Sequence, residues 1–222
     1  ESDNWALKAA AECFKDKGNH IITTKIEHHA ILHTCEWLEK HGYEVTYLDV
    51  DSNGLVDIDE FCAAIKDTTI IASIMYANNE IGTIEPIKEL GAAAHSKGVI
   101  FHTDAVQAFA HIPVNVKDMN IDMLSASGHK FHGPKGIGVL YVRKGVPLFN
   151  LIEGGAQERG KRAGTENLPG IVGMAVALKD AVSNIEKSSA KVTTLRDRLI
   201  EGLSKIEHSV LNGASENRLP GN

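Results

Sequence analysis

Apolar residues recur along this chain at two different spacings. Near the N-terminus, Trp5, Leu7, Ala10 and Phe14 repeat with the period of a helix, and the run 20–24 that follows is typical of a strand. The same alternation predicts helices over 31–38, 57–66 and 86–97 and strands over 43–48, 69–75, 99–103 and 121–126. Apolar strands separated by helices predict an α/β fold, in which a mostly parallel sheet has helices on both faces.

The connection after the strand at 121–126 departs from this rhythm. Only ten residues, rich in glycine and proline, separate Ala126 from Ile137, and this is too short for a helical crossover. We therefore expect 138–142 to be antiparallel to its neighbour or to lie away from it. From 170 to about 208 the pattern predicts helix, and 212–222 is rich in turn formers.

Composition narrows the class of protein. The chain has 222 residues, of which 43% are hydrophobic and 23% charged, with a net charge of −6. These values fit a globular domain with a sizeable core. No apolar run approaches the ~20 residues that cross a bilayer, and no block of like charge is present. We therefore expect neither a membrane nor a nucleic acid as a partner.

The spacing of the three cysteines matches neither a disulfide framework nor a metal site. Cys13, Cys35 and Cys62 are an odd number without a C-x-x-C pair, so we expect reduced, buried thiols in a cytoplasmic protein. Pairs of histidines occur on a predicted helix and in a glycine-rich loop, but neither pair has a third ligand nearby in sequence. No metal site is predicted from them.

One segment matches the calcium loop of an EF-hand. Asp49, Asp51, Asn53, Gly54 and Glu60 have the required spacing. A calcium loop of this type needs a helix before it, whereas the preceding residues alternate like a strand. The favoured interpretation is a turn at Asn53-Gly54 followed by a helix capped by an aspartate at 57 or 59.

Polar side chains gather where the predicted parallel strands end. Asn78-Asn79-Glu80, Asp104 with Gln107, and Ser125 through Lys130 follow three different strands. Because ligands of such sheets bind beyond the carboxyl ends of the strands, these side chains are expected to share one cleft. Alone, Asp104 would be a helix cap and Lys130 a solvated charge. Together, a lysine, a carboxylate and small donors suit pyridoxal 5'-phosphate.

Four motifs, in order along the chain, resemble those of one enzyme family. They are Ala77-Asn78-Asn79-Glu80-Ile81-Gly82, His102-Thr103-Asp104-Ala105-Val106-Gln107, Ser127-Gly128-His129-Lys130-Phe131-His132-Gly133-Pro134-Lys135-Gly136-Ile137-Gly138, and Arg162-Ala163-Gly164-Thr165-Glu166-Asn167. Together they resemble the cysteine desulfurases of the NifS/IscS group, which are class V aminotransferase-like enzymes, and the likeness extends over essentially the whole chain.

The resemblance implies a fold and a set of residue roles. The fold is the large domain of the aspartate-aminotransferase type, over 1–208, with 209–222 beginning a connection to a small C-terminal domain. The implied roles are Schiff-base lysine for Lys130 (with Lys135 as runner-up), pyridinium partner for Asp104, ring stacking for His28, contacts to ring oxygen and substrate for Asn79 and Gln107, phosphate contacts for Ser127 and His129, and a contact to the neighbouring subunit's phosphate for Thr165.

The resemblance also implies a reaction. Family members are homodimers that take sulfur from L-cysteine, leave L-alanine and hold the sulfur as an enzyme persulfide for a sulfur acceptor or iron-sulfur scaffold protein. None of the three cysteines matches the position of the sulfur-accepting cysteine. We therefore expect the chain to correspond to the cofactor-binding part of a longer protein, with further segments on both sides.

Two alternatives remain open at this point. A selenocysteine lyase shares nearly all of these motifs. A non-catalytic domain that dimerises, or that binds calcium through residues 49–60, is the alternative from a different class of protein.

Overall fold

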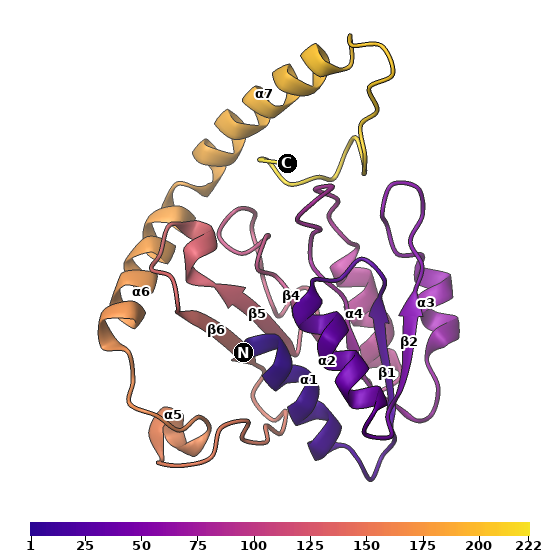
Figure 1. The fold of residues 1–222 in the computed structure, drawn as a ribbon, viewed down its shortest axis with the longest axis vertical. Coiled ribbons are helices and arrows are strands. Elements are labelled where there is room, and N and C mark those ends of the chain that lie inside the picture. Colours follow the sequence, from indigo (N-terminus) through magenta and orange to yellow (C-terminus); the bar gives the residue numbers. More distant parts are fainter.

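A six-stranded sheet organises the molecule. The computed structural model describes residues 1–222, and its strands lie in the order β2-β1-β3-β4-β5-β6 (Figure 1). Every neighbouring pair is parallel except β5 and β6, which are antiparallel. The predicted fold class is therefore confirmed. The strands are β1 (His20–Thr24), β2 (Glu44–Leu48), β3 (Thr69–Ser73), β4 (Ile100–Asp104), β5 (Met123–Ser127) and β6 (Gly138–Val142).

Helices cover both faces of this sheet. One buried cluster joins α1 and α2 to the sheet through Leu7, Ile31 and Ile71, and a larger cluster joins α3 and α4 to the opposite face through Phe61, Leu90 and other residues. Burial of these apolar side chains is the main force that holds the layers together. The helices are α1 (Ser2–Cys13), α2 (His29–Glu39), α3 (Ile58–Ala64), α4 (Ile87–Ser96), α5 (Gln157–Gly160), α6 (Leu168–Ser183) and α7 (Ile185–Leu203), with a short 3-10 helix η1 (Gly128–Phe131).

The C-terminal region is helical over most of the predicted range 170–208. The structure divides it into α6 and α7, which enclose an angle of 72°, a break that the sequence pattern did not indicate. The break falls at Asn184, whose side-chain amide and backbone N–H both donate to the carbonyl of Asp180. In Figure 1, α7 extends away from the sheet, and none of its residues is buried. No single helix of the structure is long and apolar enough to span a membrane, and only the bent pair α6 and α7 reaches that length and composition together.

The EF-hand-like segment is a turn between a strand and a helix. It follows β2, and the carboxylate of Asp51 accepts hydrogen bonds from the backbone N–H groups of Asn53 and Leu55. Gly54 has a positive φ of 80°, as the predicted turn requires. Asp57 caps α3 by accepting from the N–H groups of residues 59 and 60. The turn-and-cap interpretation is confirmed.

The prediction that all three cysteines are buried is wrong for two of them. Cys35, on the buried face of α2, is buried, whereas Cys13 is partly exposed and Cys62 is exposed. Cys62 follows Phe61, which occupies the core-facing position of α3, and the next residue along a helix points about 100° away from it.

A tight reversal between β5 and β6 carries Lys130. Within it, the N–H of Gly128 donates to the carbonyl of Ile137, and the N–H of Gly133 donates to the carbonyl of Gly128. His132 has a left-handed φ of 67° directly after η1. The reversal therefore holds Lys130 at the carboxyl end of β5 by backbone contacts on both sides.

Residues after α7 return to the sheet. The N–H of Leu219 donates to the carbonyl of Gly82, and the N–H of Ile84 donates to the carbonyl of Asn217, so the final residues pack against the loop that follows β3. That 209–222 begins a connection to a further domain stays a prediction.

Replacing Gly133 with alanine should destabilise the β5–β6 reversal. A Cβ at this position would lie 2.8 Å from the carbonyl oxygen of Gly128, so the backbone around Lys130 would have to shift. We expect Gly133→Ala to lower the free energy of unfolding in urea by about 1–3 kcal/mol. Gly202→Ala is the matched control, because its Cβ on α7 would meet nothing within 4 Å. Equal stability of the two variants would contradict the assigned packing.

Candidate active site

A cavity of about 400 Å³ lies at the carboxyl edge of the sheet. Three of the predicted site residues, Asn79, Gln107 and Lys130, line it together, which confirms that these strand ends share one cleft. Its remaining lining comes from residues near the strand ends, from the first half of α7 and from the last residues of the chain. These residues are Ala110, His111, His132, Ile185, Ser188, Ser189, Val192, Leu219, Pro220, Gly221 and Asn222.

Asn78 fixes the loop that presents Asn79. Its side-chain oxygen accepts from the N–H groups of Glu80 and Ile81, and its amide nitrogen donates to the carbonyl of Ile26. These bonds hold the loop after β3 against the turn after β1. Asn79 itself is exposed to the cavity, while Asn78 is buried behind it.

Asp104 is a buried acid at the end of β4. Burial raises the pKa of this carboxyl to about 7, and the nearby Asp3 adds to the effect. The hydrogen bond from the N–H of Val106 and the charge of Lys130 act in the opposite direction. A carboxyl in such surroundings is stabilised in its ionised form by a positive partner. Asp104 is thus suited to pair with a protonated ring nitrogen.

His102 lies on β4 two residues before Asp104, and its ring is completely buried. Its Nδ1 is 2.8 Å from the hydroxyl of Ser73 on β3, and its Nε2 is 3.0 Å from that of Ser125 on β5. Burial lowers the pKa of His102 to about 4, against an opposing effect of Asp3. The imidazole is therefore neutral and links three strands beneath the site.

Lys130 and the residues before it form a compact polar group. The hydroxyl of Ser127 and Nδ1 of His129 are 2.8 Å apart, so both groups lie together at the end of β5. The ring nitrogen Nε2 of His111 donates to the backbone carbonyl of Lys130 at 2.9 Å. Neither Ser127 nor His129 lines the cavity that Lys130 enters, so their phosphate role stays a prediction.

His28 lies on the turn between β1 and α2. Its Nδ1 accepts from the N–H of Ala30, which makes it the N-cap of α2. The adjacent Glu27 is buried and accepts from the N–H of Met75 and the hydroxyl of Thr24, so the turn is tied to the ends of β1 and β3. Burial raises the pKa of Glu27 well above its usual range. His28 is exposed and is not part of the cavity lining.

Thr165 lies apart from the other site residues. It is exposed in the loop before α6 and does not line the cavity. Its contact to a neighbouring subunit stays a prediction.

Several residues of this region carried no role in the sequence analysis. His102 opens one of the four motifs and Glu27 precedes His28 in sequence, but nothing in the sequence indicates that both are buried near the site. Asp3 lies inside α1 with a buried side chain whose Oδ1 is 3.8 Å from His102 and makes no hydrogen bond.

The residues present fit pyridoxal phosphate. A lysine enters a cavity within the 300–1,000 Å³ typical of small-molecule sites, and a buried carboxyl that a positive charge would stabilise lies within electrostatic reach of it. Lys130 would bond the aldehyde carbon, and Asp104 would hold the ring nitrogen protonated. These two groups come from different strands and meet only through the fold.

A parallel sheet with this lysine and carboxylate at its carboxyl edge defines a pyridoxal-phosphate-binding domain. The chain belongs to the aminotransferase class-V family, whose model matches residues 1–221. Pyridoxal 5'-phosphate is the cofactor of that family.

Individual relatives indicate which members of this family the chain resembles most clearly. The chain is 60% identical over 222 residues to the cysteine desulfurase IscS of Methanosarcina thermophila. Among solved structures, a NifS-like protein matches 99% of this chain with a TM-score of 0.95 and 43% identity. The structure of SspA in complex with cysteine matches 80% of it with a TM-score of 0.78 and 46% identity. The predicted resemblance to the NifS/IscS group is confirmed.

These matches cover only part of each relative. The chain spans 55% of the Methanosarcina protein, 60% of the NifS-like chain and 52% of the SspA chain.

Replacing Asp104 should change how stability depends on pH. The folded, cofactor-free chain keeps the Asp104 proton up to about pH 7, whereas the unfolded chain loses it near 3.8. The folded state therefore binds more protons between these values, and its stability falls as the pH rises through this window. Asp104→Asn removes this loss, so we expect the variant to be more stable than wild type at pH 8, by up to about 4 kcal/mol, and equal to it near pH 4.

Urea unfolding of the cofactor-free chain at pH 4, 6 and 8 measures this difference. The exposed Asp67→Asn is the control and should follow wild type at each pH. A difference between Asp104→Asn and wild type that does not vary with pH would show that Asp104 is not a destabilising buried acid.

Proposed function

We propose that this chain is the cofactor-binding part of a cysteine desulfurase. The whole protein would use pyridoxal phosphate to remove sulfur from L-cysteine, giving L-alanine and an enzyme persulfide. The observation that carries the proposal is Lys130 lining one cavity while its charge acts on the buried carboxyl of Asp104, which lies outside the cavity lining, in a chain 60% identical to a named cysteine desulfurase. The SspA structure with bound cysteine supports the choice of substrate.

Lys130, Asn79 and Gln107, which line the cavity, and Asp104, which does not, have separate tasks under this proposal. Lys130 binds the cofactor covalently and, once displaced by substrate, its amine takes the proton from the α-carbon. Asp104 keeps the positive charge at the ring nitrogen, and Asn79 and Gln107 orient ring oxygen and substrate by hydrogen bonds. When bound, pyridoxal phosphate supplies the electron sink for this chemistry.

The sulfur-accepting thiol is proposed to come from outside these residues. Neither Cys13, Cys35 nor Cys62 lines the cavity. Burial raises the pKa of the Cys35 thiol to about 12, so it is a poor nucleophile at neutral pH. A cysteine elsewhere in the whole protein would receive the sulfur and pass it to a sulfur acceptor or iron-sulfur scaffold protein.

The alternatives gain no support from the structure. The relative from Methanosarcina thermophila carries the name of a cysteine desulfurase. In the calcium-loop segment, both side-chain oxygens of Asp51 accept hydrogen bonds from residues of the same turn.

The whole protein is further proposed to be a cytoplasmic homodimer. On α6, the side chains of Leu168, Val172 and Val176 are 65%, 61% and 64% exposed and follow one another at helical spacing, so they form one apolar stripe. The stripe begins three residues after Thr165. A second copy seated on this stripe would cover it and would bring Thr165 toward the neighbouring site.

Replacing Lys130 should abolish both cofactor attachment and turnover. In the whole protein, we expect Lys130→Ala to lose the yellow absorbance of lysine-bound pyridoxal phosphate and to form alanine from cysteine at least 1,000-fold more slowly, as the order of magnitude for loss of a nucleophile that is also the general base. Lys135→Ala is the matched control, because Lys135 lies in the same reversal but does not line the cavity. The reverse ranking of the two variants would move the assignment to Lys135.

Charges on the α6 stripe should separate the proposed dimer. A carboxylate buried without a partner is costly, so we expect Val172→Asp with Val176→Asp to raise the dimer dissociation constant at least tenfold, measured by sedimentation velocity. Lys88→Asp, on the exposed side of α4, is the control and should leave it unchanged. An unchanged dimer in the double variant would place the subunit interface elsewhere.

A further inference from the structure

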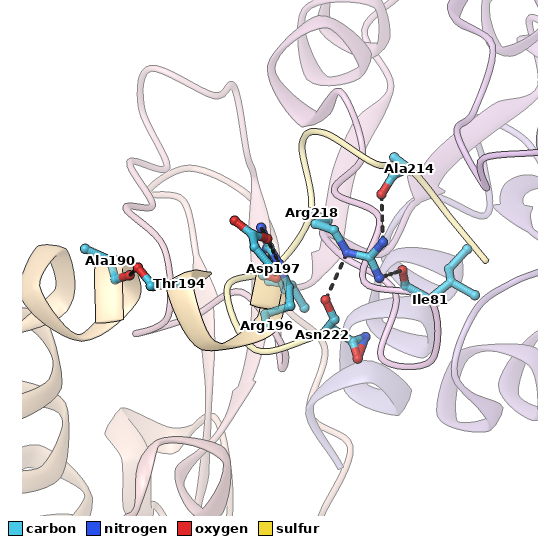
Figure 2. Close-up of polar contacts among 9 residues, drawn as sticks. Ile81, Ala190, Thr194, Arg196, Asp197, Ala214, Arg218 and Asn222 are labelled. Atoms are coloured by element: carbon cyan, nitrogen blue, oxygen red, sulfur yellow. Dashed lines mark hydrogen bonds and ion pairs between the residues drawn. The ribbon is translucent and has the colours of Figure 1, made fainter. Parts of the chain in front are cut away.

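Arg218 joins two segments of the chain by donating to three backbone carbonyls. Its Nε donates to the carbonyl of Asn222, its Nη1 to that of Ala214 and its Nη2 to that of Ile81, at 2.9, 2.9 and 3.0 Å. Figure 2 shows the guanidinium between these carbonyls, with Ile81 contributed by the loop after β3 and the other two by the final residues of the chain. Hydrogen bonds from a charged donor are stronger than those between neutral groups.

The contact between the two segments is close as well as polar. The N–H of Ala214 donates to the hydroxyl of Thr83, and the backbone bonds of Leu219 and Asn217 with this loop run alongside. A Cβ at Gly213 would lie 2.5 Å from the carbonyl oxygen of Ile81, so only glycine permits this approach. The segment 213–222 is therefore closely packed and hydrogen-bonded against the loop after β3.

This contact reaches the cavity through Asn222. The side-chain amide of Asn222 donates to the backbone carbonyl of Asn79 at 3.2 Å, and both residues line the cavity. Arg218 in turn holds the carbonyl of Asn222. A chain of two hydrogen bonds thus connects Arg218, which is not part of the cavity lining, to the residue expected to contact ring oxygen and substrate.

The position requires arginine rather than a positive charge alone. Burial and the nearby Arg196 lower the pKa of Arg218, yet a guanidinium stays charged at neutral pH. Three donors in a fixed fork match three carbonyls that come from different directions, which a single ammonium on a flexible stem cannot do. Arg196, on α7, contacts the same cavity-lining segment 219–222 at a different residue, because its Nη1 donates to the carbonyl of Leu219.

We propose that Arg218 is a positioning residue of the active site, which acts through Asn222 to set the place of Asn79 and of the cavity wall at 219–222. The inference rests on the proposed function, because it takes the cavity to be the site of cofactor and substrate. It predicts that damage to Arg218 alters substrate binding while Lys130 and Asp104 remain in place.

A double-mutant cycle in the whole protein tests this inference. We expect Arg218→Lys to raise the KM for L-cysteine about tenfold, which corresponds to about 1.4 kcal/mol of lost positioning, with the yellow absorbance retained. Asn222→Ala should raise KM in the same direction. Because both act on Asn79 in series, the double variant should be no worse than Arg218→Lys alone. Arg198→Lys, on the exposed side of α7, is the matched control and should leave KM unchanged.

The outcomes separate positioning from simple stability. Urea unfolding of each variant shows whether a KM change follows a loss of fold. Additive effects of the two substitutions, an unchanged KM in Arg218→Lys, or a KM change that only follows unfolding would each overturn the inference. If wild type forms no alanine from cysteine, the proposed function fails instead. The visible band of lysine-bound cofactor then decides the inference, since a shift shared by Arg218→Lys and Asn222→Ala supports it and unchanged bands in both overturn it.

Discussion

The buried carboxyl of Asp104 is the constraint around which the site is arranged. An ionised acid in the interior is costly without a positive partner, and the pKa of about 7 expresses that cost. The fold nevertheless places it at the end of a central strand with Lys130 as its nearby cation. A domain that tolerates this acid without a cofactor, and gains stability when a cationic ring nitrogen arrives, is preorganised for such a ligand.

His102 and Glu27 avoid adding charge near Asp104, whereas the charge of Asp3 contributes to its raised pKa. His102 is neutral, because burial lowers its pKa, and its two nitrogens are satisfied by hydroxyls from the strands on either side. Glu27 has a raised pKa and uses one oxygen to hold the turn that carries His28. Two buried groups are therefore held neutral beside the acid whose charge the chemistry needs, and their hydrogen bonds join them to the neighbouring strands.

Local chemistry made part of this arrangement predictable from sequence. Asp104, Asn79, Gln107 and Lys130 could be placed together because the carboxyl ends of parallel strands meet at one edge, and the antiparallel β6 followed from the shortness of the preceding connection. The rest depends on long-range contacts. Arg218 meets Ile81 across 137 positions, and no periodic pattern encodes that pairing. The bend at Asn184, where the side-chain amide also donates to the carbonyl of Asp180, falls within a helical pattern that contains neither glycine nor proline at this point, so no local signal marks it.

The packing of α1 has a consequence for how the chain folds during synthesis. The buried face of α1, with Leu7 and several alanines, contacts β3, β4, β5 and β6. At a typical synthesis rate of 5–20 residues per second, β6 emerges on the order of ten seconds after α1. Throughout that interval the helix has no complete partner surface. The nascent chain must therefore keep this apolar face shielded from neighbouring chains until β6 has been made.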